Sequence, residues 1–224
     1  MKVIIFDAST LITFAMNGLF DEFVALKKIF DGKFIITKEV KYEAIDRPST
    51  IRRFELESLK IRKLFEDGVL EMPSSLKIND GEVTRLAMKI LETANKSYSE
   101  HGKNIHLLDT GECSCLALSR ILSEKDITNV IAVDERTTRM LIEKPENLEK
   151  LLEVKLHTNI KLNRENFKLF NGFKVIRSSE LVYIAYKKGL VNLKKGAVLE
   201  ALLYAVKFKG CSISEEEIKE IQRL

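Results

Sequence analysis

The stretch Val3-Ile4-Ile5-Phe6-Asp7-Ala8-Ser9-Thr10-Leu11-Ile12 decides the fold. Its first four residues form an unbroken apolar run, which is typical of a strand buried on both faces of a parallel sheet. Asp7 ends the run, and residues 8–20 then carry apolar side chains at helical spacing. The stretch therefore predicts a strand that leads directly into a helix, with an acidic side chain at the turn.

Short apolar runs and helical patterns continue to alternate along the chain. We expect further strands at residues 33–36, 68–73, 130–133 and 174–176, helices at 21–30, 51–65, 82–91 and 113–122, and a polar loop at 95–104. This order favours an α/β fold with three layers, α/β/α, around a central, mainly parallel sheet. In such sheets the functional crevice lies beyond the carboxyl ends of the strands.

The chain divides into a core, an insert and a closing segment of the same domain. Residues 1–142 form the core, and residues 143–172 break its rhythm with an insert in which alternating side chains around Asn159 indicate a small hairpin. Residues 173–224 add the closing strand and C-terminal helices, at 181–188 and 195–209, each ended by a glycine. Ser214 and Glu217 have the spacing of a capping box for the last helix.

Composition excludes several classes of protein. With 45% hydrophobic and 31% charged residues among 224, the chain is neither mainly disordered, nor collagen-like, nor a disulfide scaffold. The formal charge of +4 permits a nucleic-acid partner without requiring one. The three cysteines lack the neighbours of a zinc site, so we expect them to be buried and reduced. The first apolar run is too short to span a membrane, and we expect a cytoplasmic protein without membrane contact.

Four acidic residues are expected to meet at the carboxyl edge of the sheet. Asp7 and Asp134 each end an apolar run, although both are also favoured helix caps. Glu43 falls on the apolar side of a helix that begins after Thr37, where an unpaired carboxylate needs a cation; the other interpretation is an acid at a helix edge. Glu112 begins the helix that leads into the strand ending at Asp134.

A Gly-Glu helix start is not diagnostic by itself. Asp109-Thr110-Gly111-Glu112 has capping-box spacing, and Asn79-Asp80-Gly81-Glu82 has the same shape in front of a helix that leads to a polar loop. Only the context, a helix that leads into the strand ending at Asp134, favours Glu112 as a site residue. Asp109 is a further candidate acid. Clustered carboxylates repel one another, and an oxygen-only site suits Mg²⁺ or Mn²⁺ better than Zn²⁺.

Four segments, in order, resemble the motifs of the PIN-domain nucleases, in the subgroup that has Gly-Glu in its third motif. They are Val3–Ile12, Thr37-Lys38-Glu39-Val40-Lys41-Tyr42-Glu43, Gly111-Glu112-Cys113-Ser114-Cys115-Leu116-Ala117-Leu118, and Ile131-Ala132-Val133-Asp134-Glu135-Arg136 with Arg139. The resemblance covers about residues 1–142 and 173–224. The insert 143–172 has no counterpart, and Glu135 stands where many relatives have a second Asp.

The resemblance implies metal-dependent hydrolysis of RNA phosphodiester bonds. Asp7, Glu112 and Asp134 would hold one or two Mg²⁺ or Mn²⁺ ions, and Glu43 would be a further catalytic carboxylate. The supporting residues would be Ser9, Thr10, Asp109 and Glu135, and Arg136 and Arg139 would bind substrate phosphates or lie on a solvated helix face. Many members of the family are VapBC-type toxins, so an antitoxin, another protein partner or a homodimer is also compatible.

Two other functions remain open from the sequence. One is a PIN-like module that binds RNA or protein with little or no catalysis. The other is a phosphatase of the haloacid-dehalogenase type, in which the Asp after the first strand is a nucleophile. That chemistry needs a second Asp two residues further on, where this chain has Ser9.

Overall fold

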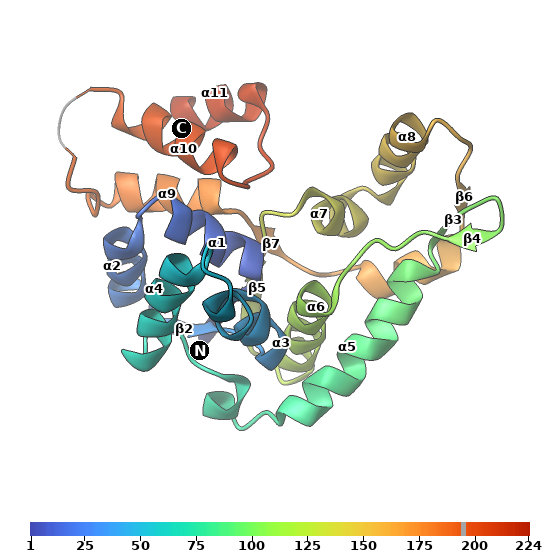
Figure 1. Ribbon diagram of the computed structural model, residues 1–224, viewed down its shortest axis with the longest axis horizontal. Coiled ribbons are helices and arrows are strands. Elements are labelled where there is room, and N and C mark those ends of the chain that lie inside the picture. Colours follow the sequence, from blue (N-terminus) through green and yellow to red (C-terminus); the bar gives the residue numbers. More distant parts are fainter. Residues whose placement is uncertain (194–195) are drawn as a thin grey trace.

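A computed structural model describes residues 1–193 and 196–224 as a mixed α/β fold with a parallel four-stranded sheet and many helices (Figure 1). The central strand β1 (Lys2–Phe6) pairs with β2 (Gly32–Ile35) and β5 (Thr128–Ala132), and β7 (Val175–Ile176) extends the sheet beyond β5. All these pairs are parallel, which confirms the predicted α/β class and the parallel sheet.

The helices follow most of the predicted positions. Their bounds are α1 (Ala8–Met16), α2 (Phe20–Ile29), α3 (Lys38–Lys41), α4 (Glu55–Glu66), α5 (Asp80–Asn95), α6 (Thr110–Glu124), α7 (Arg136–Glu143), α8 (Pro145–Leu156), α9 (Ser178–Lys187), α10 (Val198–Phe208) and α11 (Glu215–Arg223). The first helix is shorter than predicted because Gly18 has a φ of 68°, a left-handed conformation that ends a helix.

The core holds the central strand in place. The last four residues of β1 are all buried, and the Phe6 ring packs with its centroid 4.9 Å from that of Phe23 and 4.8 Å from that of Phe34. On the paired strands, Phe6 lies opposite Ala132, and the Asp7 N–H donates to the Ala132 carbonyl at 2.9 Å. The ends of β1 and β5 are therefore level, as the sequence predicts.

Two predicted elements of the first half differ from the structure. Residues 68–73 do not form a strand: a single bridge joins Ile35 to Glu71, because Pro73 begins a 3₁₀ turn two residues later. Residues 95–104 are not a plain loop, since β3 (Tyr98–Glu100) and β4 (Lys103–Asn104) form a hairpin around Gly102, whose φ is 79°.

The hairpin predicted in residues 143–172 is wrong. Its first arm is the last turn of α8, which begins at Pro145 and buries Leu148 and Leu152 at helical spacing. Its second arm is β6 (Lys161–Leu162), which pairs antiparallel with β3 in a small second sheet. Short apolar runs are ambiguous between periods of 2 and 3.6, and here the helical period prevails.

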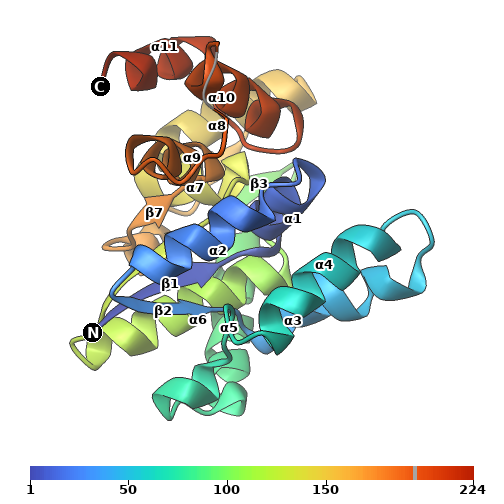
Figure 2. The same cartoon turned by 90° about the vertical axis from the view of Figure 1, so that its left-hand side faces the viewer.

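The C-terminal helices gather at one side of the sheet (Figure 2). The predicted capping box of α11 is confirmed, with the Ser214 N–H donating to Glu217 at 2.8 Å. The helix predicted at 195–209 is observed as α10, and its first predicted residue, Lys195, lies outside the described residues. Cys113, Cys115 and Cys211 are buried and not disulfide-bonded, as expected. None of the described helices combines the length and the apolar character needed to cross a membrane.

Candidate active site

Ser9 joins the ends of the two central strands. Its hydroxyl donates to Asp7 Oδ2 at 2.5 Å, its backbone N–H donates to the same oxygen at 3.0 Å, and its oxygen accepts the Asp134 N–H at 3.1 Å. Asp7 is 3% exposed and Asp134 is fully buried. The two strand-end aspartates are thus tied together by a hydroxyl for which the sequence predicts a supporting role.

Asp134 is held from behind by the C-terminal segment. Its Oδ1 accepts the Ser178 N–H at the N-terminus of α9 at 2.8 Å, and its carbonyl accepts the Ser212 N–H at 3.2 Å. A helix N-terminus stabilises an anion placed there. The other carboxylate oxygen, Oδ2, is buried without a hydrogen-bond partner among the described residues. A buried carboxylate oxygen of this kind is costly unless something else binds it.

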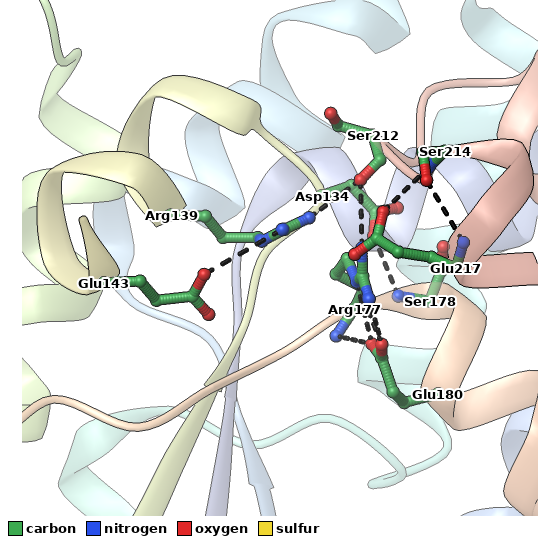
Figure 3. A network of polar contacts seen from close by, with 9 residues as sticks. All are labelled: Asp134, Arg139, Glu143, Arg177, Ser178, Glu180, Ser212, Ser214 and Glu217. Atoms are coloured by element: carbon green, nitrogen blue, oxygen red, sulfur yellow. Dashed lines mark hydrogen bonds and ion pairs between the residues drawn. The ribbon is translucent and has the colours of Figure 1, made fainter. Parts of the chain in front are cut away.

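Arg177 links the C-terminal helices to one another next to Asp134 (Figure 3). Its guanidinium donates to Glu180 at 2.5 Å, to Glu217 on α11 at 2.8 Å and to the Ser212 carbonyl at 3.2 Å. Since the same Ser212 binds the backbone of Asp134, this ion-pair network fixes the back wall of the site.

Glu43 reaches the site from a π-helical turn, Tyr42–Asp46, that follows α3. Its Oε1 accepts the Gly111 N–H at 3.1 Å and the Thr110 hydroxyl at 3.4 Å, at the N-terminus of α6. A Cβ on Gly111 would lie 2.2 Å from Glu43 Oε2, so only glycine leaves room for this carboxylate. Wide turns of this kind occur often at functional sites.

Glu112 is fixed through both carboxylate oxygens. Oε2 accepts the Asp109 N–H at 2.9 Å, as in a capping box, and Oε1 accepts the hydroxyl of Thr138 on α7. The capping interpretation is therefore right, and it does not exclude a place in the site, because the second oxygen is turned toward α7. The comparison pair behaves differently: Glu82 is exposed on α5.

Burial and mutual repulsion raise the pKa of three of the four carboxyls. Burial is the main cause in each. The pKa of Glu112 rises to about 8, with the charge of Asp7 as the second contribution. The same charge adds to the raised pKa of Glu43, and the charge of Asp134 adds to that of Asp7, against the hydrogen bonds from Ser9. Asp7 is thus the common electrostatic neighbour of the other three.

These carboxylates lack a basic partner. In residues 1–193 and 196–224, no Lys, Arg or His nitrogen lies within 4.0 Å of any of the four. Nor does this described part contain a group of three or more His, Cys, Asp or Glu side chains that could hold a metal ion as they stand. Among the residues that the structure describes, the site is therefore an acidic cluster without a basic partner, in which each carboxylate accepts hydrogen bonds from its own N–H or O–H donors.

No family model, curated protein or solved structure matches the chain. The functional proposal therefore rests on the geometry of the site itself.

The remaining predicted site residues lie around this cluster. Thr10 is buried, and its hydroxyl has no partner among the described residues. Asp109 is exposed and lies 2.8 Å from the His106 ring, and Glu135 caps α7. Arg136 is exposed, whereas Arg139 is mostly buried and donates to the Ser212 carbonyl at 2.7 Å.

Three groups that position the acids were not predicted from the sequence: Thr138, the Ser178 N–H and Arg177. A backbone N–H at a helix start has no residue signature, so Ser178 could not be found from the sequence. Thr138 stands four residues after Asp134 on the exposed-looking start of a helix, and only its hydrogen bond with Glu112, 26 residues away, reveals it.

Proposed function

We propose that the protein is a metal-dependent ribonuclease of the PIN type, with its site at the carboxyl edge of the sheet. The observation that carries the proposal is the cluster of four carboxylates from four parts of the chain, coupled through Asp7 and without a basic partner among the described residues. The PIN-like three-layer arrangement is part of the proposal. It is supported by α2 and α6, which lie on either side of β1 and β2 (Figure 2).

The donor set fits a hard divalent cation. The oxygens are all carboxylate or hydroxyl, which suits Mg²⁺ or Mn²⁺, and Asp134 Oδ2 is a buried acceptor without a donor in the described chain. Asp7, Glu112 and Asp134 would hold the ion, which when bound supplies Lewis-acid polarisation of a phosphoryl oxygen. No group of three such side chains in the described residues could hold an ion as it stands, so these three would have to move closer together to hold one.

The side chains of the chain itself have defined tasks. Ser9 keeps Asp7 oriented toward the end of β5, and Thr138 keeps Glu112 oriented toward α7. Glu43, with its raised pKa, is the candidate to accept a proton from the attacking water at neutral pH. Burial of Asp7 and Asp134 excludes bulk water from the floor of the site and strengthens each of these interactions.

Cleavage of generic single-stranded RNA with Mn²⁺, with and without a chelator, tests the proposal. We expect cleavage by the wild type, none with chelator, and loss of at least a hundredfold in Asp7→Asn and Glu112→Gln. Glu82→Gln is the matched control, because it removes the acid of the same Gly-Glu start on an exposed helix face. If Asp7→Asn cleaves as well as the wild type, the site is not the catalyst.

A second candidate function is a PIN-like module that binds RNA or protein without cleaving it. The absence of a ready metal-ligand group in the described residues favours it. Calorimetric titration with Mn²⁺ separates the two functions, since the nuclease requires an ion bound at Asp7 and Asp134, and the binding module does not.

A further inference from the structure

A groove of about 360 Å³ opens directly beside the acidic cluster. Glu43 is one of the residues that line it, and the others come from α1, from residues 44–54 and from α4. Apart from Glu43, no residue that lines this groove takes part in the proposed chemistry. A chain that occupies the groove would therefore lie against Glu43, one of the four carboxylates.

The groove is lined by two arginines whose side chains have no acidic or hydrogen-bonding partner among the described residues. Arg47 and Arg53 are both exposed and form no ion pair or side-chain hydrogen bond within the described chain. The nearby Arg62 instead faces Asp46 at 3.9 Å. The acids of the groove are Glu43, which is bound by the Gly111 N–H, and Glu57 on α4. The charges that line the groove are therefore two exposed arginines and two glutamates, of which Glu43 is already bound by a backbone N–H.

The groove also presents an aromatic face. Phe54 is 45% exposed, and the Arg53 guanidinium lies 5.4 Å from its ring centroid. Met16 on the facing helix is 46% exposed. Exposed aromatic rings flanked by arginine are the platform on which unpaired bases stack, and the arginines beside them bind the phosphates.

We propose that this groove binds a single-stranded segment of the nucleic-acid substrate, with Arg47 and Arg53 on its phosphates and Phe54 against a base. The inference rests on the proposed function and adds the place where the single-stranded substrate binds. A duplex keeps its base faces stacked and cannot use Phe54, so the groove selects single strands. The free arginines favour a polyanion over an apolar peptide in the same place, since a peptide of that kind would leave both cations unpaired.

The test measures binding without catalysis. A fluorescein-labelled twelve-nucleotide oligouridylate is titrated with the full chain in chelator, followed by anisotropy at several salt concentrations. Arg47→Ala combined with Arg53→Ala should weaken binding by at least tenfold. It should also lower the slope of log K against log salt by about 1.4, because each phosphate of a single strand that a cation neutralises adds about 0.7 to that slope. Phe54→Ala should weaken binding about tenfold without changing the slope.

The matched control removes the same charge elsewhere. Arg85 and Arg164 are exposed and lie outside the groove, so Arg85→Ala combined with Arg164→Ala should leave binding within twofold of the wild type. A duplex of the same length should bind at least tenfold more weakly than the single strand. An equal loss in both double variants, or equal binding of duplex and single strand, overturns the inference. Absence of any RNA binding overturns it too.

The outcomes separate this inference from the proposed function. RNA that binds through Arg47 and Arg53 but is never cleaved with Mn²⁺ refutes the nuclease and keeps the groove. Mn²⁺-dependent cleavage that is undiminished in the same double variant, at subsaturating RNA, refutes the groove and keeps the nuclease. Thermal melting of each variant checks the fold, which substitutions at exposed side chains should leave intact.

Discussion

Replacing Gly111 by alanine should disable the site while leaving the fold in place. The new Cβ would lie 2.2 Å from Glu43 Oε2, and ordinary van der Waals separation begins at 3.4 Å, so the carboxylate must withdraw by about 1.2 Å. The Glu43 side chain can swing away, whereas the backbone of α6 is fixed. A displacement of about 1 Å at a catalytic group can cost about a hundredfold in rate. We therefore expect RNA cleavage to fall by between tenfold and about a hundredfold.

Stability should change much less. Loss of the hydrogen bond from the Gly111 N–H to a charged acceptor costs about 1.5–3 kcal/mol. Better solvation of the displaced Glu43 and the helix preference of alanine over glycine, about 0.5–1 kcal/mol, offset part of this loss. The remaining loss of about 0.5–2.5 kcal/mol should lower the melting temperature by roughly 1–10 °C, at about 2–4 °C per kcal/mol in a chain of this size, and leave the chain folded.

Gly81→Ala is the matched control for this substitution. Gly81 occupies the same position in the Asn79-Asp80-Gly81-Glu82 helix start, and a Cβ there would meet only the Asn79 side chain, at 3.0 Å. Cleavage rates and Mn²⁺ affinities of the two variants, measured beside their melting curves, give the comparison. Wild-type behaviour in Gly111→Ala, or an equal loss in Gly81→Ala, would refute the steric argument.

Three further substitutions test the supports of the acids. The pKa of Glu112 is raised, mainly by burial, to about 8 from 4.5, so the folded metal-free chain keeps a proton that the unfolded chain has released. Its stability should fall as pH rises between these values and level off above about pH 8, and thermal melts should show Glu112→Gln flattening this dependence; a rise over that interval contradicts the assignment. Thr138→Val should raise the pKa of Glu112 further and slow cleavage at pH 7 about tenfold, seen as a shifted pH–rate profile that Thr137→Val does not produce. Arg177→Met should lower the free energy of unfolding by about 2–4 kcal/mol in urea titrations, because Glu180 and Glu217 lose their partner; an unchanged midpoint would show that the network is dispensable.

The strand-end acids could be predicted because strong local signals place them. Residues 3–6 and 130–133 are apolar runs that favour buried strands in a chain of this pattern, and an aspartate follows each run. Parallel pairing then brings Asp7 and Asp134 to the same edge without any knowledge of loops. The position of Glu43 in the sequence also favours a side chain directed at the site. The π-helical turn that orients this side chain could not be predicted.

The supports of these acids could not be predicted, because they depend on distant parts of the chain. Ser178 acts through its backbone N–H, 44 residues from Asp134, and any residue except proline could supply that donor. The hairpin predicted in residues 143–172 was wrong for a different reason. Its apolar residues at 154, 156, 160 and 162 satisfy a period of 2 only when Leu148 and Leu152, which set the helical period, are left out.

The two Gly-Glu helix starts show why the same sequence motif has different roles in two places. Gly81 faces open space apart from its own cap, and Glu82 is exposed, so that pair begins a helix and nothing more. Gly111 has no side chain, which leaves room for the Glu43 carboxylate to bind the Gly111 N–H. Glu112, the next residue, adds a second carboxylate. At the start of α6, glycine is required because another element brings an anion onto the backbone N–H. The diagnostic feature is therefore the pairing of Gly111 with Glu43 across 68 residues, which a local motif cannot contain.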